Sequence, residues 1–383
     1  MTIIIKDIHS TMDKNIQMAF AAIDKVIEQS IPSFNESEAR GKDYIQWGED
    51  NIFPNYLYGL YTDVTTLRSI VNRTADMVAG DGVNCVLEQF NKEVNKKGDT
   101  LYELIQSISR DYLVYGNAFI QVVRNKAGQI GELYHLPAKY MRTSKKNDLF
   151  YYSEEYDKKY SRSNKRVVYP KFVPDATDIA TSVIMLKSEN DKTYGLPLYI
   201  ASLKDCEVER QLSDFNLSQL ENGFFGSYVF NFGNGIPTDE QKAEIEKDIQ
   251  EKFCGSGNVG RFLLNFSDGK DNGVTLSKLD IVNYAEKYNT TSERASKKIY
   301  EAFGASPVLM GVEKDTSGFN DEDYQQAFKI YNRLTVRPLQ KRIVTMFDKI
   351  FNTTGSVEIK PFTIDWSDDE ETNDTVNNDE QTI

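Results

Sequence analysis

The strongest constraint on the fold is a pair of long helical segments separated by about 60 residues of a different pattern. The first helix is predicted to begin at Pro197, because the fixed φ of proline suits the first helical position, and to end at Asn222-Gly223. The second is predicted from about Asn283 to Phe303. Two long helices that bracket an insert are expected to lie antiparallel as a stalk.

The insert itself mixes helix and strand signals. Thr238 and Gln241 form a capping box, which predicts a helix that continues to Phe253. Short β-branched and aromatic runs predict strands at Tyr228–Phe232, Arg261–Phe266 and Val274–Leu279. The insert is therefore predicted to be a small α/β unit.

The first half of the chain also combines helices with strands. Apolar residues at helical spacing predict a helix between Ser10 and Pro32, and another runs from Val64 to Gly80. A capping box of Thr100 and Glu103 opens a third helix, which ends at Gly116. A hairpin with a turn at Asn125–Gln129, further strands near Phe150, Val167 and Val183, and an exposed connection over Tyr151–Arg166 follow. The predicted fold class is α+β.

Composition and charge exclude several classes of protein. With 40% hydrophobic residues the chain is not disordered throughout, and its net charge of −13 disfavours a protein that coats nucleic acid with basic residues. Seven acids and no base lie between Ser367 and Ile383, so this end is predicted to be a disordered acidic tail. No segment approaches the roughly 18 apolar residues of a membrane span.

Residues that carry chemistry are few. Cys85, Cys206 and Cys254 are odd in number and far apart, which argues against a disulfide framework or a Cys-x-x-Cys zinc site and fits a reducing compartment. The histidines are His9 and His135, and neither lies in a local motif that suits a zinc hydrolase or a Ser-His or Cys-His arrangement. His135 has no nucleophile or paired carboxylate nearby in sequence. We interpret His135 as a packed structural residue.

A glycine run at residues 255–260 matches the spacing of a dinucleotide-binding fingerprint. A helix precedes it and a strand follows it, which is the reverse of the order that pyrophosphate binding requires, and no Walker lysine is present. Asp368–Glu371 would hold a hard cation only weakly without a shaping glycine. We therefore expect no catalytic residue, metal or cofactor and no enzymatic activity; a nucleotide-dependent enzyme remains an alternative.

Residues 310–320 form a polar, glycine-containing loop between two helices. The helix after the loop carries apolar residues at helical spacing from Tyr324 to Ile350 and is interrupted by Pro338. Because proline has no N–H to donate to the Leu334 carbonyl, Pro338 is expected to kink this helix.

From about Trp47 to Asp365 the order of several short motifs resembles the tailed-bacteriophage portal protein family, and their order is more specific than any one of them. The matching residues are Tyr115-Gly116-Asn117-Ala118, Leu136-Pro137, Tyr194-Gly195-Leu196-Pro197, Asn222-Gly223-Phe224-Phe225, Ile299, Ala302-Phe303-Gly304, Pro307, Gly311, Asn320-Asp321-Glu322 and Pro338. Ser306 departs from the pattern, because a second apolar or proline residue is expected there.

The resemblance implies a ring of about twelve subunits at one capsid vertex, through whose channel an ATP-driven terminase pushes DNA. The implied partners are double-stranded DNA, the terminase large subunit, the major capsid protein and a head–tail connector or adaptor, with no membrane. The protein would be assembled in the host cytoplasm and reside in the virion at the portal vertex. A minor capsid or head–tail adaptor protein without a channel is the alternative.

Mapped onto this chain, the resemblance implies a portal-type subunit with an α/β wing, a two-helix stem, a small α/β clip and a kinked tunnel helix, with the crown lacking or minimal. DNA would be contacted by Lys314, Thr316, Ser317, Gly318 and Phe319. The implied parts are an N-terminal helical arm (1–40), wing (41–195), first stem helix (196–223), clip (224–282), second stem helix (283–304), tunnel loop (310–320), kinked helix (321–351), wing strand (352–366) and acidic tail (367–383).

Overall fold

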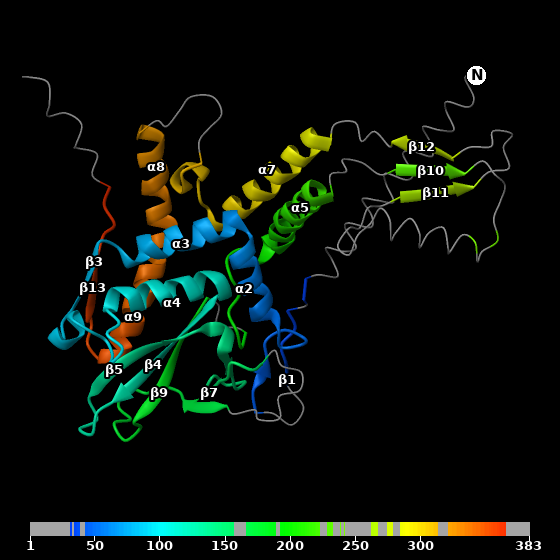
Figure 1. The fold of residues 1–383 in the computed structure, drawn as a ribbon. Coiled ribbons are helices and arrows are strands. Elements are labelled where there is room, and N and C mark those ends of the chain that lie inside the picture. Colours follow the sequence, from blue (N-terminus) through cyan, green and yellow to red (C-terminus); the bar gives the residue numbers. More distant parts are fainter. Residues whose placement is uncertain are drawn as a thin grey trace, which may run out of the picture. The chain divides into compact units, whose positions relative to one another are not determined.

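The computed structural model of the chain combines helices with small sheets (Figure 1), which confirms the predicted α+β class. It divides into two units, one with its described residues between Ser202 and Ile299 and one that comprises those before and after them. Within the described residues, no helix has both the length and the apolar content of a membrane span. The structure describes residues 31–32, 34–38, 43–156, 166–188, 192–222, 228–232, 238, 241, 262–266, 274–278, 284–312 and 321–364.

Three helices lie early in the larger unit: α2 (Phe53–Asp63), α3 (Thr65–Ala79) and α4 (Leu101–Tyr115). The capping box predicted at the start of α4 is confirmed, since the side chains of Thr100 and Glu103 each accept the other residue's backbone N–H. Helix α2 was not predicted from the aromatic-rich sequence, although Pro54 stands in its first turn, where proline is favoured.

A three-stranded antiparallel sheet follows, with β4 (Asn117–Arg124) between β5 (Ile130–Leu136) and β9 (Thr181–Lys187). The predicted hairpin is confirmed by the pairing of β4 with β5. Helix α4 packs against this sheet (Figure 1), and residues of β4 are buried on both faces. The sheet therefore lies between α4 and further structure on its other side.

The other side carries a second antiparallel sheet, in which β7 (Leu149–Tyr152) lies between β6 (Met141–Thr143) and β8 (Val167–Pro170). The Phe119 ring of β4 meets the Phe150 ring of β7 edge to face at 5.8 Å. Tyr151, expected in an exposed connection, is instead buried in β7; residues 157–165 of that connection lie outside the described residues. Two-stranded pairs are β1 (Ser37–Glu38) with β2 (Ile45–Gln46) and β3 (Gly82–Cys85) with β13 (Val357–Lys360).

An aromatic and cationic cluster fills the core beside β6. The Trp47 and Tyr194 rings stack at 4.4 Å, and the fully buried Arg142 guanidinium lies 4.3 Å from the Tyr156 ring centre. No carboxylate accepts from Arg142 within the described part of the chain. Its acceptors are the side-chain and backbone oxygens of Asn51 and the carbonyls of Lys139 and Met141.

The smaller unit contains α5 (Leu203–Asn222), most of α7 (Tyr284–Phe303) and a three-stranded sheet. The first long helix begins at Leu203 rather than at the predicted Pro197. A 3₁₀ turn, η3 (Ile200–Ser202), precedes it, and the Pro197 carbonyl accepts the Ile200 N–H within a turn instead of continuing into an α-helix. In the sheet, β10 (Tyr228–Phe232) pairs parallel with β11 (Phe262–Phe266) and antiparallel with β12 (Val274–Lys278), as the strand patterns predicted.

Helices α5 and α7 contact each other near one pair of ends. The Ser202 hydroxyl donates to the Lys298 carbonyl at 3.2 Å, and the Ser296 hydroxyl donates to the Glu209 carboxylate at 3.3 Å. Ser202 ends η3 and Glu209 lies further along, in α5, whereas its partner Ser296 precedes Lys298 in α7, so the two helices run antiparallel here. The second capping box has both hydrogen bonds between Thr238 and Gln241, whereas the helix predicted beyond it and the N-terminal helix lie outside the described residues.

Two glycines bring distant backbone segments together in the larger unit. Gly116 ends α4 in the left-handed conformation (φ 70°), and a Cβ there would lie 2.8 Å from the Pro197 nitrogen. At Gly195 a Cβ would lie 2.7 Å from the Ser188 nitrogen and still closer to the Gly116 carbonyl oxygen. The Asn117 side chain accepts the Gly195 N–H at 2.8 Å and donates to the Gly195 carbonyl at 3.0 Å. These contacts leave no room for a side chain at either glycine.

We predict that Gly195→Ala destabilises the purified chain by about 3 kcal/mol, because its Cβ would force two backbone segments apart. Gly59→Ala is the matched control, since no atom lies within 4 Å of its Cβ position and it stands inside α2. That control is expected to stabilise by about 0.5–1 kcal/mol. Urea unfolding midpoints measure both changes; equal effects of the two substitutions would contradict the close approach.

Candidate functional site

The structure describes the residues on both sides of the polar loop predicted at 310–320, but not those at the centre of the loop. All five predicted DNA-contact residues, Lys314, Thr316, Ser317, Gly318 and Phe319, lie outside the described residues, as does the glycine run at 255–260. The described residues end at Val312 before the centre of the loop and begin again at Asp321 after it. The site is therefore built from the elements that hold the two ends of the loop.

A short 3₁₀ helix, η4 (Pro307–Met310), carries the N-terminal end of the loop. Helix α7 stops before it because Gly304 turns left-handed (φ 61°), and Gly311 closes η4 in the same conformation (φ 75°). Val308, Leu309 and Met310 are buried, so η4 is anchored in the larger unit by its apolar side chains. This anchoring fixes the position from which the loop departs.

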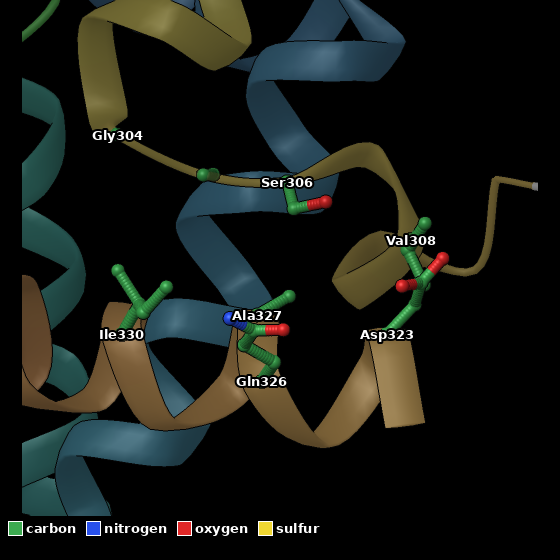
Figure 2. Close-up of a pocket in the computed structure, with 8 residues that line it drawn as sticks. Gly304, Ser306, Val308, Asp323, Gln326, Ala327 and Ile330 are labelled. Atoms are coloured by element: carbon green, nitrogen blue, oxygen red, sulfur yellow. The ribbon is translucent and has the colours of Figure 1, made fainter. Parts of the chain in front are cut away.

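A pocket of about 330 Å³ lies between the segment after α7 and helix α8 (Figure 2). Ser306, the residue that departs from the family pattern, lines it from one side, and Asp323 and Gln326 line it from α8. The remaining lining residues are small or aliphatic: Gly304, Ala305, Val308, Ala327 and Ile330. With one carboxylate and no second titratable group in its lining, the pocket suits packing against a side chain better than acid–base catalysis.

The C-terminal end of the loop leads into one continuous helical segment: α8 (Asp321–Tyr331), the π-helical turn η5 (Asn332–Val336) and α9 (Arg337–Phe351). The Arg337 N–H donates to the Asn332 carbonyl, five residues back, which is the hydrogen bond of a π-turn. Pro338 follows directly, in the first turn of α9. The irregularity therefore falls where the sequence placed a helix break, while the kink itself stays a prediction.

Two side chains fasten this segment to α3, one on each side of the π-turn. The buried Tyr331 hydroxyl lies 2.6 Å from the Thr74 hydroxyl, and burial raises the pKa of Tyr331 to about 12. Tyr331 therefore keeps its proton at neutral pH. Beyond the π-turn, the Gln340 amide donates to the Val78 carbonyl at 3.1 Å, close to the end of α3.

His135 lies beside a carboxylate of α4, and its structural role stays a prediction. Its Nε2 lies 2.7 Å from Asp111 Oδ2, and the same carboxylate oxygen accepts the Ala138 N–H at 2.8 Å. Asp111 stands 24 residues earlier on α4, so sequence spacing gave no sign of this pair. Among the described residues, no three His, Cys, Asp or Glu side chains are grouped to hold a metal ion.

Sequence reasoning missed two features of the segment that carries the loop. The Thr74–Tyr331 hydrogen bond joins residues 257 positions apart, and only the place of Tyr331 in the apolar stripe of its helix pointed to burial. The π-turn has no sequence signature apart from the nearby proline. Both features set how the helix after the loop is held.

The fold is shared with chains in solved structures of gene transfer agent particles and with a solved phage portal protein. A chain of the virion of the native gene transfer agent (GTA) particle superposes with a TM-score of 0.55 at 19% identity, covering 88% of each chain. A chain of the native GTA neck, computed with C12 symmetry, gives 0.53 at 18% identity and covers 88% of each. An HK97 family phage portal protein from Corynebacterium diphtheriae gives 0.50 at 12% identity, covering 79% of this chain and 93% of that one.

Sequence comparison gives the family. The probable portal protein of Escherichia phage P2 is 23% identical over 234 residues, which cover 61% of this chain and 63% of the relative. That of Haemophilus phage HP1 is 22% identical over 262 residues, covering 67% and 71%. The sequence model of the phage portal protein family matches residues 82–366, well over half of the chain. This chain therefore belongs to the phage portal protein family.

Proposed function

We propose that this protein is the subunit of a ring-shaped DNA channel at one vertex of a phage capsid. The observation that carries the proposal is the family match over residues 82–366, and the likeness to a neck chain with C12 symmetry supports a closed ring. About twelve copies would surround double-stranded DNA, within a shell of major capsid protein. The terminase large subunit would dock during packaging and a head–tail connector or adaptor afterwards, in a particle assembled in the host cytoplasm.

The charge balance supports a channel through which DNA slides better than a protein that binds DNA tightly. A net charge of −13 disfavours a chain that binds phosphates through many basic residues, so a duplex can slide without many simultaneous contacts. The portal would hydrolyse nothing, because the terminase supplies the ATP-driven force. The chain's part is to hold the channel open and to present surfaces for docking.

The smaller unit would supply the stem and the clip. Helices α5 and α7 contact each other through Glu209 and Ser296 and would form the stem. The sheet of β10, β11 and β12 lies between these helices in the sequence and would form the clip that faces the terminase and the tail components. The larger unit would form the wing, with residues 1–40 as an arm and residues 367–383 as an acidic tail.

The tunnel loop would be residues 310–320, presented by η4 and by α8. Buried Leu309 before the loop and buried Tyr331 at the end of α8 anchor both sides of it, which supports a loop held at its ends. Lys314, Thr316, Ser317, Gly318 and Phe319 would touch the passing duplex from each subunit. The helix after the loop would bend at Pro338.

Assembly tests the proposed function directly. A ring of twelve 43.8-kDa subunits weighs about 526 kDa, so mass photometry of the purified full chain is expected to show a species near this mass. Negative-stain images should show rings with a central opening. Monomers or dimers alone, under conditions in which the protein is folded, would favour the adaptor without a channel.

The loop assignment predicts that changing residues 316–319 to alanine leaves the rings intact, because a loop that lines a lumen buries little area between subunits. The amount of DNA packaged or retained should fall, measured by nuclease-protected DNA per particle. Lys126→Ala, in an exposed hairpin turn, is the control and should package normally. If the alanine variant instead dissolves the rings, the loop is a contact between subunits and the assignment is wrong.

The absence of enzymatic activity is also testable. The purified chain is expected to turn over no ATP with or without DNA, measured by phosphate release. Residual turnover that persists in Gly257→Ala and Gly260→Ala would point to a contaminant. Turnover abolished by either substitution would show that the glycine run binds nucleotide and would contradict this prediction.

A further inference from the structure

A row of basic side chains runs along the helical segment after the loop. Lys329, Arg333, Arg337 and Lys341 stand four residues apart on α8, η5 and α9, and all four are exposed. None of them makes a side-chain hydrogen bond or an ion pair with another residue in the described part of the chain. We call these four residues the basic row.

The π-turn keeps the basic row on one side of the segment. In an α-helix a step of four residues overshoots a full turn by about 40°, so such a row drifts around the axis. The π-turn between Arg333 and Arg337 takes more residues per turn, which offsets this drift at the centre of the row. From Lys329 to Lys341 the row is about 18 Å long at 1.5 Å rise per residue.

No Asp or Glu lies between Lys329 and Lys341, although the chain as a whole has a net charge of −13. The position before it at the same spacing is Gln325, and the position after it is Thr345. Four like charges along about 18 Å, without a carboxylate between them, create a local positive potential that attracts an extended anion.

We propose that the basic row binds the phosphate backbone of double-stranded DNA. This inference rests on the proposed function and names a DNA contact outside the loop of residues 310–320. Phosphates on one strand advance about 3.4 Å per nucleotide along the duplex axis, so the row spans about five of them. Arg333 and Arg337 at its centre carry guanidinium groups, whose planar donors match phosphate oxygens in pairs.

A second copy of this chain is a less suitable occupant. Lys329 and Lys341, at the two ends of the row, are of a residue type that is depleted at protein–protein interfaces relative to the rest of the surface. An apolar pair better suited to a neighbouring subunit lies about 100° around the helix: Ile330 is 52% exposed and Leu334 is 70% exposed. The basic row is therefore assigned to DNA, and a contact between subunits becomes an outcome of the test.

The test compares two double variants with the same loss of charge. R333Q/R337Q removes the centre of the row, and K126Q/K146Q removes two exposed lysines from turns elsewhere. Binding of a fluorescent 30-base-pair duplex is titrated by anisotropy between about 50 and 200 mM salt, over which phosphate contacts weaken. Mass photometry of the same samples reports the assembly.

R333Q/R337Q is expected to bind DNA about 10- to 100-fold more weakly at 100 mM salt, with the salt slope smaller by about two, because each phosphate contact contributes about 0.9. Its assembly mass should match that of the wild type, and K126Q/K146Q should bind like the wild type. Unchanged affinity and slope in R333Q/R337Q, or equal losses in both variants, would overturn the inference.

Two further outcomes separate this inference from the proposed function. If R333Q/R337Q loses the assembly of the wild type, the row is a contact between subunits and the inference fails. If the wild type forms no ring, the proposed function is contradicted; the DNA titration, made on the species that is present, still decides the inference. No wild-type binding to the duplex at about 50 mM salt also overturns it.

Discussion

The larger unit depends on one backbone contact, in which Gly195 lies against Gly116 with no space for a side chain at either position. Gly116 is where α4 ends and β4 begins, so the contact holds a helix, a sheet and the returning chain at one point. Asn117 completes it, because one side-chain amide both donates to and accepts from Gly195. The two motifs of the family pattern that contain these glycines thus form one structural element, which explains why both need glycine.

Beside this contact, a buried cation is held without a buried anion among the residues that the structure describes. Burial lowers the pKa of Arg142, because desolvation disfavours the charged form, yet a guanidinium remains charged in proteins. The Asn51 side chain and several carbonyls accept its hydrogen bonds, and the guanidinium carbon lies over the aromatic ring of Tyr156. Since Asn51 precedes α2 and Arg142 lies on β6, this single side chain joins the start of the unit to its second sheet.

Features fixed by a few neighbouring residues were predictable, whereas those set by distant partners were not. The capping box of Thr100 and Glu103 and the hairpin turn are local, so their residues alone specify them. The start of α5 was placed too early because Pro197 also belongs to the contact with Gly116, and tertiary packing there overrides the helix-start signal. The order of the motifs gave the family, but spacing could not give the Asp111–His135 pair, nor the loop's side-chain positions.

The π-turn before Pro338 also determines on which side of the helical segment the basic residues lie. Pro338 has no N–H for the Leu334 carbonyl, and immediately before it the chain forms a π-turn closed by the Arg337 N–H. Because that turn takes more residues per turn than an α-helix, it removes the excess rotation of a four-residue step and keeps Arg333 and Arg337 on one side of the segment. In the proposed channel, the acidic balance of the chain would disfavour DNA binding elsewhere, and the basic row would bind the duplex over a short length of the channel. The contacts of the basic row, four side chains in each subunit, would be weak enough for the duplex to leave, because each phosphate contact is screened by salt.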